Sequence, residues 1–241
     1  MSIDIFIRSY PKDFFLLNYC LHSIKKFVKG YRDIVLVVRN KNYEQLLQDV
    51  DISNVKVIIS HDFDDSIDYC GQQICKLYAN IWSDAEYFFY VDSDCIFYDT
   101  FDIREKYFDE NKNIILFKEY WHNLQSDSFV WQGCLRELDL LTEFETMRRL
   151  PQIYPSRILS PIRSLIENKT GKDYINGCLD IYKKVSFSEF NIMGSYILLY
   201  DQKNINMMLY DPKYNQIPCK QFWSHEKREI LLEQICKLLL L

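Results

Sequence analysis

Two carboxylates follow a run of five apolar or aromatic residues in the first half of the chain. Residues 87–91 read Tyr-Phe-Phe-Tyr-Val, and Asp92 and Asp94 come directly after them. Such a run is typical of a strand buried on both faces of a parallel sheet. On an extended backbone, side chains two residues apart point the same way, so both carboxylates would share one side. Like charges held together need a cation or a proton, and a hard divalent ion prefers oxygen ligands, so the pair predicts a site for Mg²⁺ or Mn²⁺ with a substrate phosphate. The alternative is a solvated turn in which one carboxylate caps the next segment.

Other residues have side chains suited to a metal–phosphate site. His225 follows an apolar run, so its imidazole is a candidate third metal ligand, or else a surface histidine before a helix. Gln73 and Lys76 lie in the first turns of a predicted helix, whose N-terminus favours phosphate; they also fit an ordinary polar helix face. Glu189 begins another predicted helix, where a carboxylate either stabilises the helix through its dipole or acts as a general base.

The elements that must position these residues alternate between strands and helices over the first hundred residues. Apolar runs predict strands at 3–7, 34–38 and 55–59, with the run before Asp92 as the fourth. Helical periodicity predicts a helix at 14–28, capped by Asp13 and stopped at Gly30, and further helices are predicted at 43–50 and 70–82. This alternation indicates an α/β fold with a mostly parallel, doubly wound sheet, in which ligands bind beyond the carboxyl ends of the strands.

The second half has a looser pattern. We predict a strand at 113–117, an aromatic and polar stretch without clear period at 119–132, and a helix at 136–150 that ends at Pro151. Further helices are predicted at 155–169 and at 188–200, the latter with Ser188 as its N-cap, and a strand-like run at 217–223 leads into a terminal helix. The expected organisation is one domain, residues 1–241, in which helices and loops of 101–241 lie over the edge of 1–100.

Composition narrows the class of function. A formal net charge of −5 gives no reason to expect non-specific binding to nucleic acid or anionic membranes. No segment approaches the ~20 apolar residues of a membrane span, and the first residues do not resemble a signal peptide. The eight cysteines form no C-x-x-C pair and mostly lie in apolar runs, which indicates reduced core thiols. Together these features predict a cytoplasmic protein, in a cell or in the cytosol of a virus-infected host.

Three short motifs occur in an order known from one family. They are Q-Q-x-x-K-L at 72–77, D-x-D at 92–94 and S-E-[FY]-x-x-x-G at 188–194. In these motifs the chain resembles GT-A-fold glycosyltransferases, in particular a small bacterial and viral glycosyltransferase-like family. The resemblance implies a Rossmann-like GT-A sheet flanked by helices. It also implies transfer of a hexosyl group from a nucleotide-diphosphate sugar, most typically a UDP-sugar, to a hydroxyl of a glycan or other acceptor.

The resemblance also assigns roles to individual residues. Asp94 and Asp92 would bind the Mn²⁺ or Mg²⁺ that bridges the donor diphosphate, and His225 would complete the metal shell. Glu189 would be the base of an inverting transfer; a retaining enzyme would need no such base. The residues expected to contact the nucleotide sugar are Arg8, Ser9, Tyr10, Arg39, Gln73, Lys76, Asp92 and Ser93. The acceptor would stack on Trp121, His122 and Trp131, which are otherwise explained as core aromatics.

Three other classes compete with this interpretation. A haloacid-dehalogenase-type phosphatase carries D-x-D on its first strand, followed by small residues, whereas here the motif follows the fourth strand and precedes Cys-Ile-Phe. A nucleotidyltransferase shares the α/β layer and the metal, but usually has a glycine-rich loop after the first strand, and residues 8–11 contain no glycine. A non-catalytic nucleotide-sugar-binding domain would keep the strands without needing the carboxylates, which are all present. The chain can be a whole protein or one domain of a longer transferase.

Overall fold

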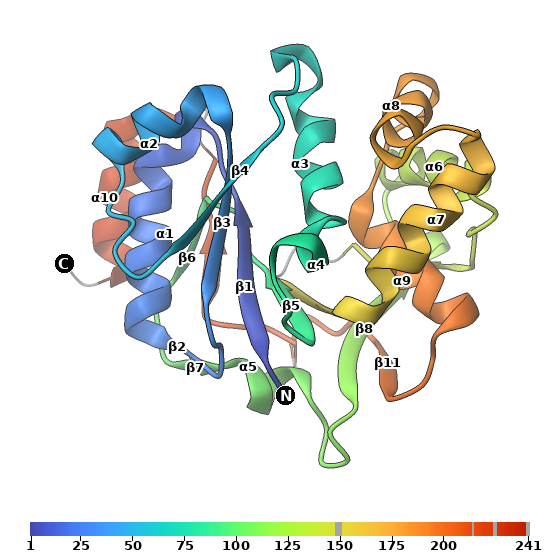
Figure 1. Ribbon diagram of the computed structural model, residues 1–241. Helices are drawn as coiled ribbons and strands as arrows, with labels where there is room; N and C mark the ends of the chain where they lie inside the picture. Colours follow the sequence, from blue (N-terminus) through green and yellow to red (C-terminus); the bar gives the residue numbers. More distant parts are fainter. Residues whose placement is uncertain (148–150, 214, 224–225, 240–241) are drawn as a thin grey trace.

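A computed structural model describes residues 1–147, 151–213, 215–223 and 226–239. It has an α/β fold around a mixed, mostly parallel five-stranded sheet of order β10-β5-β1-β3-β4 (Figure 1). The parallel strands are β1 (Ile3–Arg8), β3 (Ile34–Arg39), β4 (Lys56–Ser60) and β5 (Tyr87–Tyr90), and β10 (Gln152–Pro155) runs antiparallel to β5. The predicted α/β class, the mostly parallel sheet and its first four strands are confirmed. Every residue of β1 and β3 is buried, as their continuous apolar runs predicted.

Helices cover both faces of this sheet. In Figure 1, α1 (Phe14–Phe27), α2 (Tyr43–Asp49) and α10 (Arg228–Leu239) lie on one side, and α3 (Asp68–Lys76) and α4 (Ala79–Trp82) on the other. The predicted helix 70–82 is therefore two helices. Asp13 precedes α1, but its side chain makes no capping hydrogen bond, which corrects the predicted N-cap. It instead accepts a hydrogen bond from Ser93, at 2.8 Å between Oγ and Oδ2.

The second half adds a group of helices beside the sheet (Figure 1): α6 (Gln132–Glu137), α7 (Leu159–Thr170), α8 (Tyr174–Lys184) and α9 (Glu189–Tyr200). Helices α7 and α9 agree with prediction, and Ser188 caps α9 by accepting a hydrogen bond from the Asn191 backbone. The predicted helix 136–150 is wrong, because Asp139 adopts a left-handed φ of 55° and ends the short helix α6. Residues 148–150 lie outside the described part. Helix α8 was not predicted.

Smaller sheets attach the remaining strands. β8 (Ile114–Tyr120) pairs with β9 (Phe144–Glu145) and β11 (Ile205–Leu209). β6 (Cys95–Phe97) pairs with β12 (Cys219–Gln221), and β2 (Val28–Lys29) with β7 (Phe101–Asp102), which leads into α5 (Ile103–Tyr107).

One cluster of buried apolar residues runs from β1 to Ile153, Met193 and Ile217 in the second half. All eight cysteines are unpaired, and six are buried. Within the described residues, no helix is both long and apolar enough to cross a membrane.

Candidate functional site

A cleft of about 410 Å³ lies at the carboxyl end of β5. Segments that are far apart in the sequence line it: the turns after β1 and β5, one face of α3, the start of α9 and the end of β12. On α3, Tyr69, Gln72, Gln73 and Lys76 reach this cleft together because residues three and four apart share a helix face. The cleft therefore lies at the sheet edge where α/β folds bind their ligands.

Asp92 and Asp94 both line this cleft, as the sequence predicted, although the backbone reason was wrong. Strand β5 ends at Tyr90, and the chain then turns so that the Cys95 amide donates to the Asp92 carbonyl at 3.0 Å. The two carboxylates thus come from a turn instead of one side of an extended strand. The Asp92 side chain is 36% exposed, whereas Asp94 is 8% exposed.

The surroundings of Asp94 are unfavourable for its charge. Burial, and then the nearby carboxylates of Asp92 and Asp13, raise the pKa of Asp94 to about 8. The Gln221 side chain counteracts part of this effect, because its Nε2 donates to both Asp94 oxygens at 3.1 and 3.4 Å. Asp13 and Gln221 were missed as site residues. Asp13 follows the first strand, at the sheet edge where ligands bind, but the sequence offered a helix cap as the simpler role.

Lys76 and Glu189 meet at the same cleft. The Lys76 ammonium lies 2.8 Å from Oε1 of Glu189 and 3.0 Å from Oδ1 of Asp92, and both the Lys76 and Glu189 side chains are 4% exposed. Burial by itself lowers the pKa of Lys76, but the attraction of Asp92 and Glu189 outweighs it and raises the pKa above its ordinary value. The ammonium also lies 4.5 Å from the centre of the Phe190 ring. All three motifs therefore contribute to one cluster of charges.

A second hollow of about 580 Å³ shares Tyr10, Tyr69 and Gln72 with the cleft, and Arg39 and Lys41 also line it. Of the residues expected to contact a nucleotide, the structure brings six to one of these two hollows: Tyr10, Arg39, Gln73, Lys76, Asp92 and Ser93.

Arg8 and Ser9 are buried outside the described lining of both hollows. The Arg8 guanidinium donates to both carboxylate oxygens of Asp68, the first residue of α3, and so holds the start of that helix against β1. Contact of these two residues with a nucleotide sugar stays a prediction, since neither of them is among the residues that line the two hollows.

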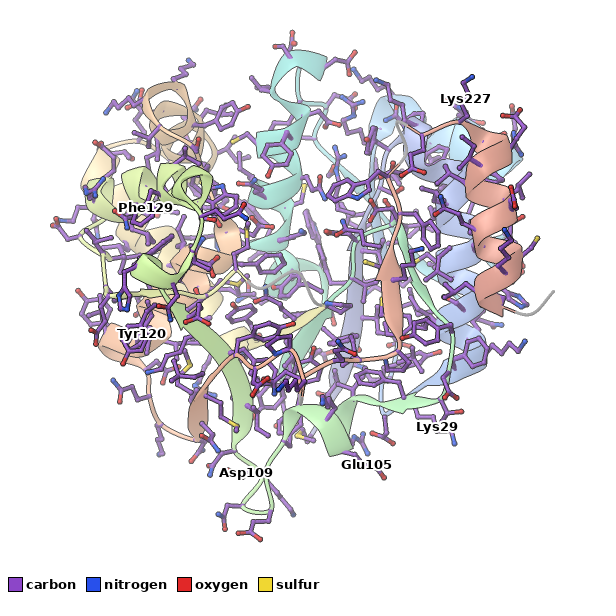
Figure 2. All side chains as sticks on the ribbon, turned by 180° about the vertical axis from the view of Figure 1, so that it is seen from behind. Lys29, Glu105, Asp109, Tyr120, Phe129 and Lys227 are labelled. Carbon is purple, nitrogen blue, oxygen red and sulfur yellow. The ribbon has the colours of Figure 1, made fainter. Side chains whose placement is uncertain are left out.

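The three residues of the predicted acceptor platform lie in different environments. Trp131 lines the cleft, but Trp121 is buried and its indole nitrogen donates to the Thr142 carbonyl at 3.0 Å. His122 is exposed and stacks on Tyr120, and Figure 2 shows Tyr120 and Phe129 on the opposite side of the view from Lys227. Two exposed aromatic residues that were not predicted as site residues, Tyr69 and Trp223, also line the cleft.

A metal site here would rest mainly on Asp92 and Asp94. The predicted third ligand, His225, lies outside the described residues. Among the residues that are described, no group of three or more histidine, cysteine or acidic side chains is arranged to hold a metal. A pair of carboxylates still suits Mg²⁺ or Mn²⁺, because such ions keep several water ligands and bind substrate phosphates. The buried, crowded carboxyl group of Asp94 fits a cation that would relieve its repulsion from Asp92 and Asp13.

Neither a protein-family model nor a curated protein matches this chain. The residues of the cleft and their geometry are therefore the basis for assigning a function.

Proposed function

We propose that this protein is a metal-dependent glycosyltransferase with a GT-A-type fold. It would transfer a sugar from a nucleotide-diphosphate sugar to a hydroxyl acceptor such as a glycan. One observation carries the proposal: Lys76, the Asp92–Asp94 pair and Glu189 come from three distant motifs and line a single cleft beyond the end of a parallel strand. If Asp92 and Asp94 only formed a solvated turn, and Glu189 only stabilised its helix through the dipole, these charges would have no reason to lie together in one cleft.

The two hollows suit the two ends of a nucleotide sugar. The larger hollow, beside Arg39 and Lys41, would take the nucleoside, and a UDP-sugar is the donor we expect there. The cleft would take the diphosphate and the sugar, with Asp94 and Asp92 holding Mg²⁺ or Mn²⁺. When bound, such an ion stabilises the negative charge that develops on the leaving diphosphate. Tyr10 and Gln72 line both hollows and would lie along the bound donor.

Glu189 would serve as the base of an inverting transfer. Its carboxylate lines the cleft and is almost fully buried, so an acceptor hydroxyl that enters the cleft would meet it away from bulk water. The base takes the hydroxyl proton while the acceptor oxygen attacks the donor sugar, and the diphosphate leaves with the electron pair of the broken bond. General base catalysis of this kind typically contributes about 10²–10⁴-fold in rate.

The test is calorimetric binding of a panel of nucleotide sugars, with Mn²⁺ and then with EDTA. The wild type is compared with Asp94→Ala and with a control variant, Asp49→Asn, which changes an exposed carboxylate on α2. We expect Mn²⁺-dependent binding of one nucleotide class that Asp94→Ala abolishes and Asp49→Asn retains. Transfer of radiolabelled sugar from that donor to a panel of glycans, or to water, would then identify the reaction.

Other outcomes would point to the competing classes. If no nucleotide bound under any condition, the glycosyltransferase proposal would fail. Preference for a nucleoside triphosphate, with release of pyrophosphate, would favour a nucleotidyltransferase. Donor binding without transfer to any acceptor or to water would favour a non-catalytic binding domain.

A further inference from the structure

A lysine buried between two carboxylates links the parts of the cleft. Lys76 is 3% exposed, and its ammonium contacts Asp92 from the turn after β5 and Glu189 from the first turn of α9. The last turn of α3, which carries Lys76, is held on two sides: Tyr90 donates to the Lys76 carbonyl and Tyr174 to the Ile74 carbonyl, each at 3.0 Å. The backbone that carries Lys76 is therefore held by contacts with β5 and α8.

These contacts leave the ammonium little capacity for a ligand. A lysine has three N–H donors, and here carboxylate oxygens take two of them while the Phe190 ring lies over the same group. A donor phosphate that used the third N–H would lie beside two carboxylates that repel it, and one that displaced Glu189 would separate a buried pair. Separating such a buried pair leaves an uncompensated charge, which is strongly unfavourable.

We propose that Lys76 is a positioning residue for Glu189, and not a ligand of the donor phosphates. The ammonium contacts both Oε1 of Glu189 and Oδ1 of Asp92, and so fixes the carboxylate that would receive the proton of an acceptor hydroxyl in the cleft. This role rests on the proposed function, because it gives meaning to Glu189 as a base. It also gives a reason for α3, the turn after β5 and α9 to meet. The one ammonium of Lys76 aligns Glu189 with Asp92, which would hold the metal and the donor diphosphate.

The first test needs no substrate. Lys76→Met, Glu189→Gln and the double variant are compared with wild type by urea unfolding. Each single change removes one charge of the buried pair, so we expect both to destabilise the protein and the double variant to be less destabilised than their sum. The control is the exposed pair of Lys169 on α7 with Asp139, for which Lys169→Met and Asp139→Asn should act almost additively. Additive effects at Lys76 and Glu189 would overturn the proposed pairing.

The second test separates positioning from donor binding, using the nucleotide sugar that the calorimetric panel selects. In Lys76→Met we expect the donor Kd to stay within about threefold while kcat for transfer falls by roughly 100-fold or more, since the change affects the reacting step and not ground-state binding. Lys76→Arg keeps the cation and should recover part of kcat at unchanged KM for the donor.

The outcomes of the two tests can be told apart. A Lys76→Met variant whose donor affinity falls at least tenfold with kcat retained would show a phosphate ligand, and would overturn the positioning role while the proposed function stands. An unchanged kcat would overturn it too. A wild type that binds no nucleotide sugar would overturn the proposed function itself and this role with it, whatever the unfolding experiment shows.

Discussion

At the scale of the residue, Asp94 shows how strongly this fold alters the chemistry of one side chain. Its carboxyl group is buried beside Asp92 and Asp13, and its pKa is raised from 3.8 to about 8. Between these two pH values the folded protein retains a proton that the unfolded chain has already released. Because the folded state binds more protons in this window, its stability falls as the pH rises from about 4 to about 8.

This shift predicts the pH dependence of stability. In EDTA, the free energy of unfolding of the wild type should decrease between pH 5.5 and pH 8.5 by more than that of Asp94→Asn, which has no proton to lose at this position. Urea unfolding at the two pH values measures the difference, and Asp49→Asn is the control. Added Mg²⁺ should restore stability to the wild type at the higher pH and have no such effect on Asp94→Asn. Equal pH dependence in wild type and Asp94→Asn would contradict the raised pKa.

At the scale of the element, α9 is held close to the segment that follows β9. The Thr146 backbone amide donates to the Asn191 side chain at 2.9 Å, and the Thr146 hydroxyl donates to the Phe190 carbonyl at 3.1 Å. Gly194 lies against Thr146, and a Cβ added there would overlap the threonine side chain. The glycine of the S-E-F-x-x-x-G motif therefore allows the close approach that holds the first turn of α9, and with it Glu189.

Gly194→Ala tests this packing through the sign of its effect. Inside an exposed helix, glycine to alanine typically stabilises a protein by up to about 1 kcal/mol. Here we expect a loss of about 1–3 kcal/mol, because the added methyl group must displace Thr146 in a packed core. Chemical denaturation measures the change, with Leu199→Ala, an exposed position on the same helix, as the control. A neutral or stabilising Gly194→Ala would contradict the close contact.

At the scale of the whole molecule, the two halves of the chain share one sheet and one core. β10 supplies the strand beside β5, in the register Ile153 opposite Phe89, and the apolar cluster continues from β1 into α7 and α9. Residues 1–100 carry Asp92, Asp94 and Lys76. Without the rest of the chain they would lack Glu189, and the edge of β5 that pairs with β10 would be exposed.

This shared core predicts that residues 1–100 do not fold alone. Expressed as a fragment, they should lack a cooperative thermal transition and show poor dispersion of backbone amide signals by NMR, because the burial that offsets their chain entropy comes partly from the second half. The full chain under the same conditions is the control. A fragment with a sharp transition and well-dispersed signals would show instead that the first half is an independent domain.

Local patterns in the sequence determined much of the framework. Apolar runs predicted β1, β3, β4 and β5. Strands β1 and β3 are buried on both faces, where apolar residues predominate, whereas β4 is a partly exposed edge strand. Helical periodicity predicted α1, and the hydroxyl of Ser188 marked the start of α9. The residue types of Asp92, Asp94, Lys76 and Glu189 suggested chemistry, since each motif sits at an end of a predicted element.

Only the tertiary structure decided how those residues meet. The pairing of Lys76 with Glu189, the part of Asp13 and Gln221 in the site, and the burial of Trp121 depend on which distant segments pack together. Hydrophobic periodicity indicates that one face of a helix or strand is buried, but not which other element packs against that face. For the same reason the sequence could not foresee that residues 144–145 would pair with β8 after Asp139 had ended α6. Long-range packing, which no local pattern encodes, placed the charges of three short motifs in one cleft.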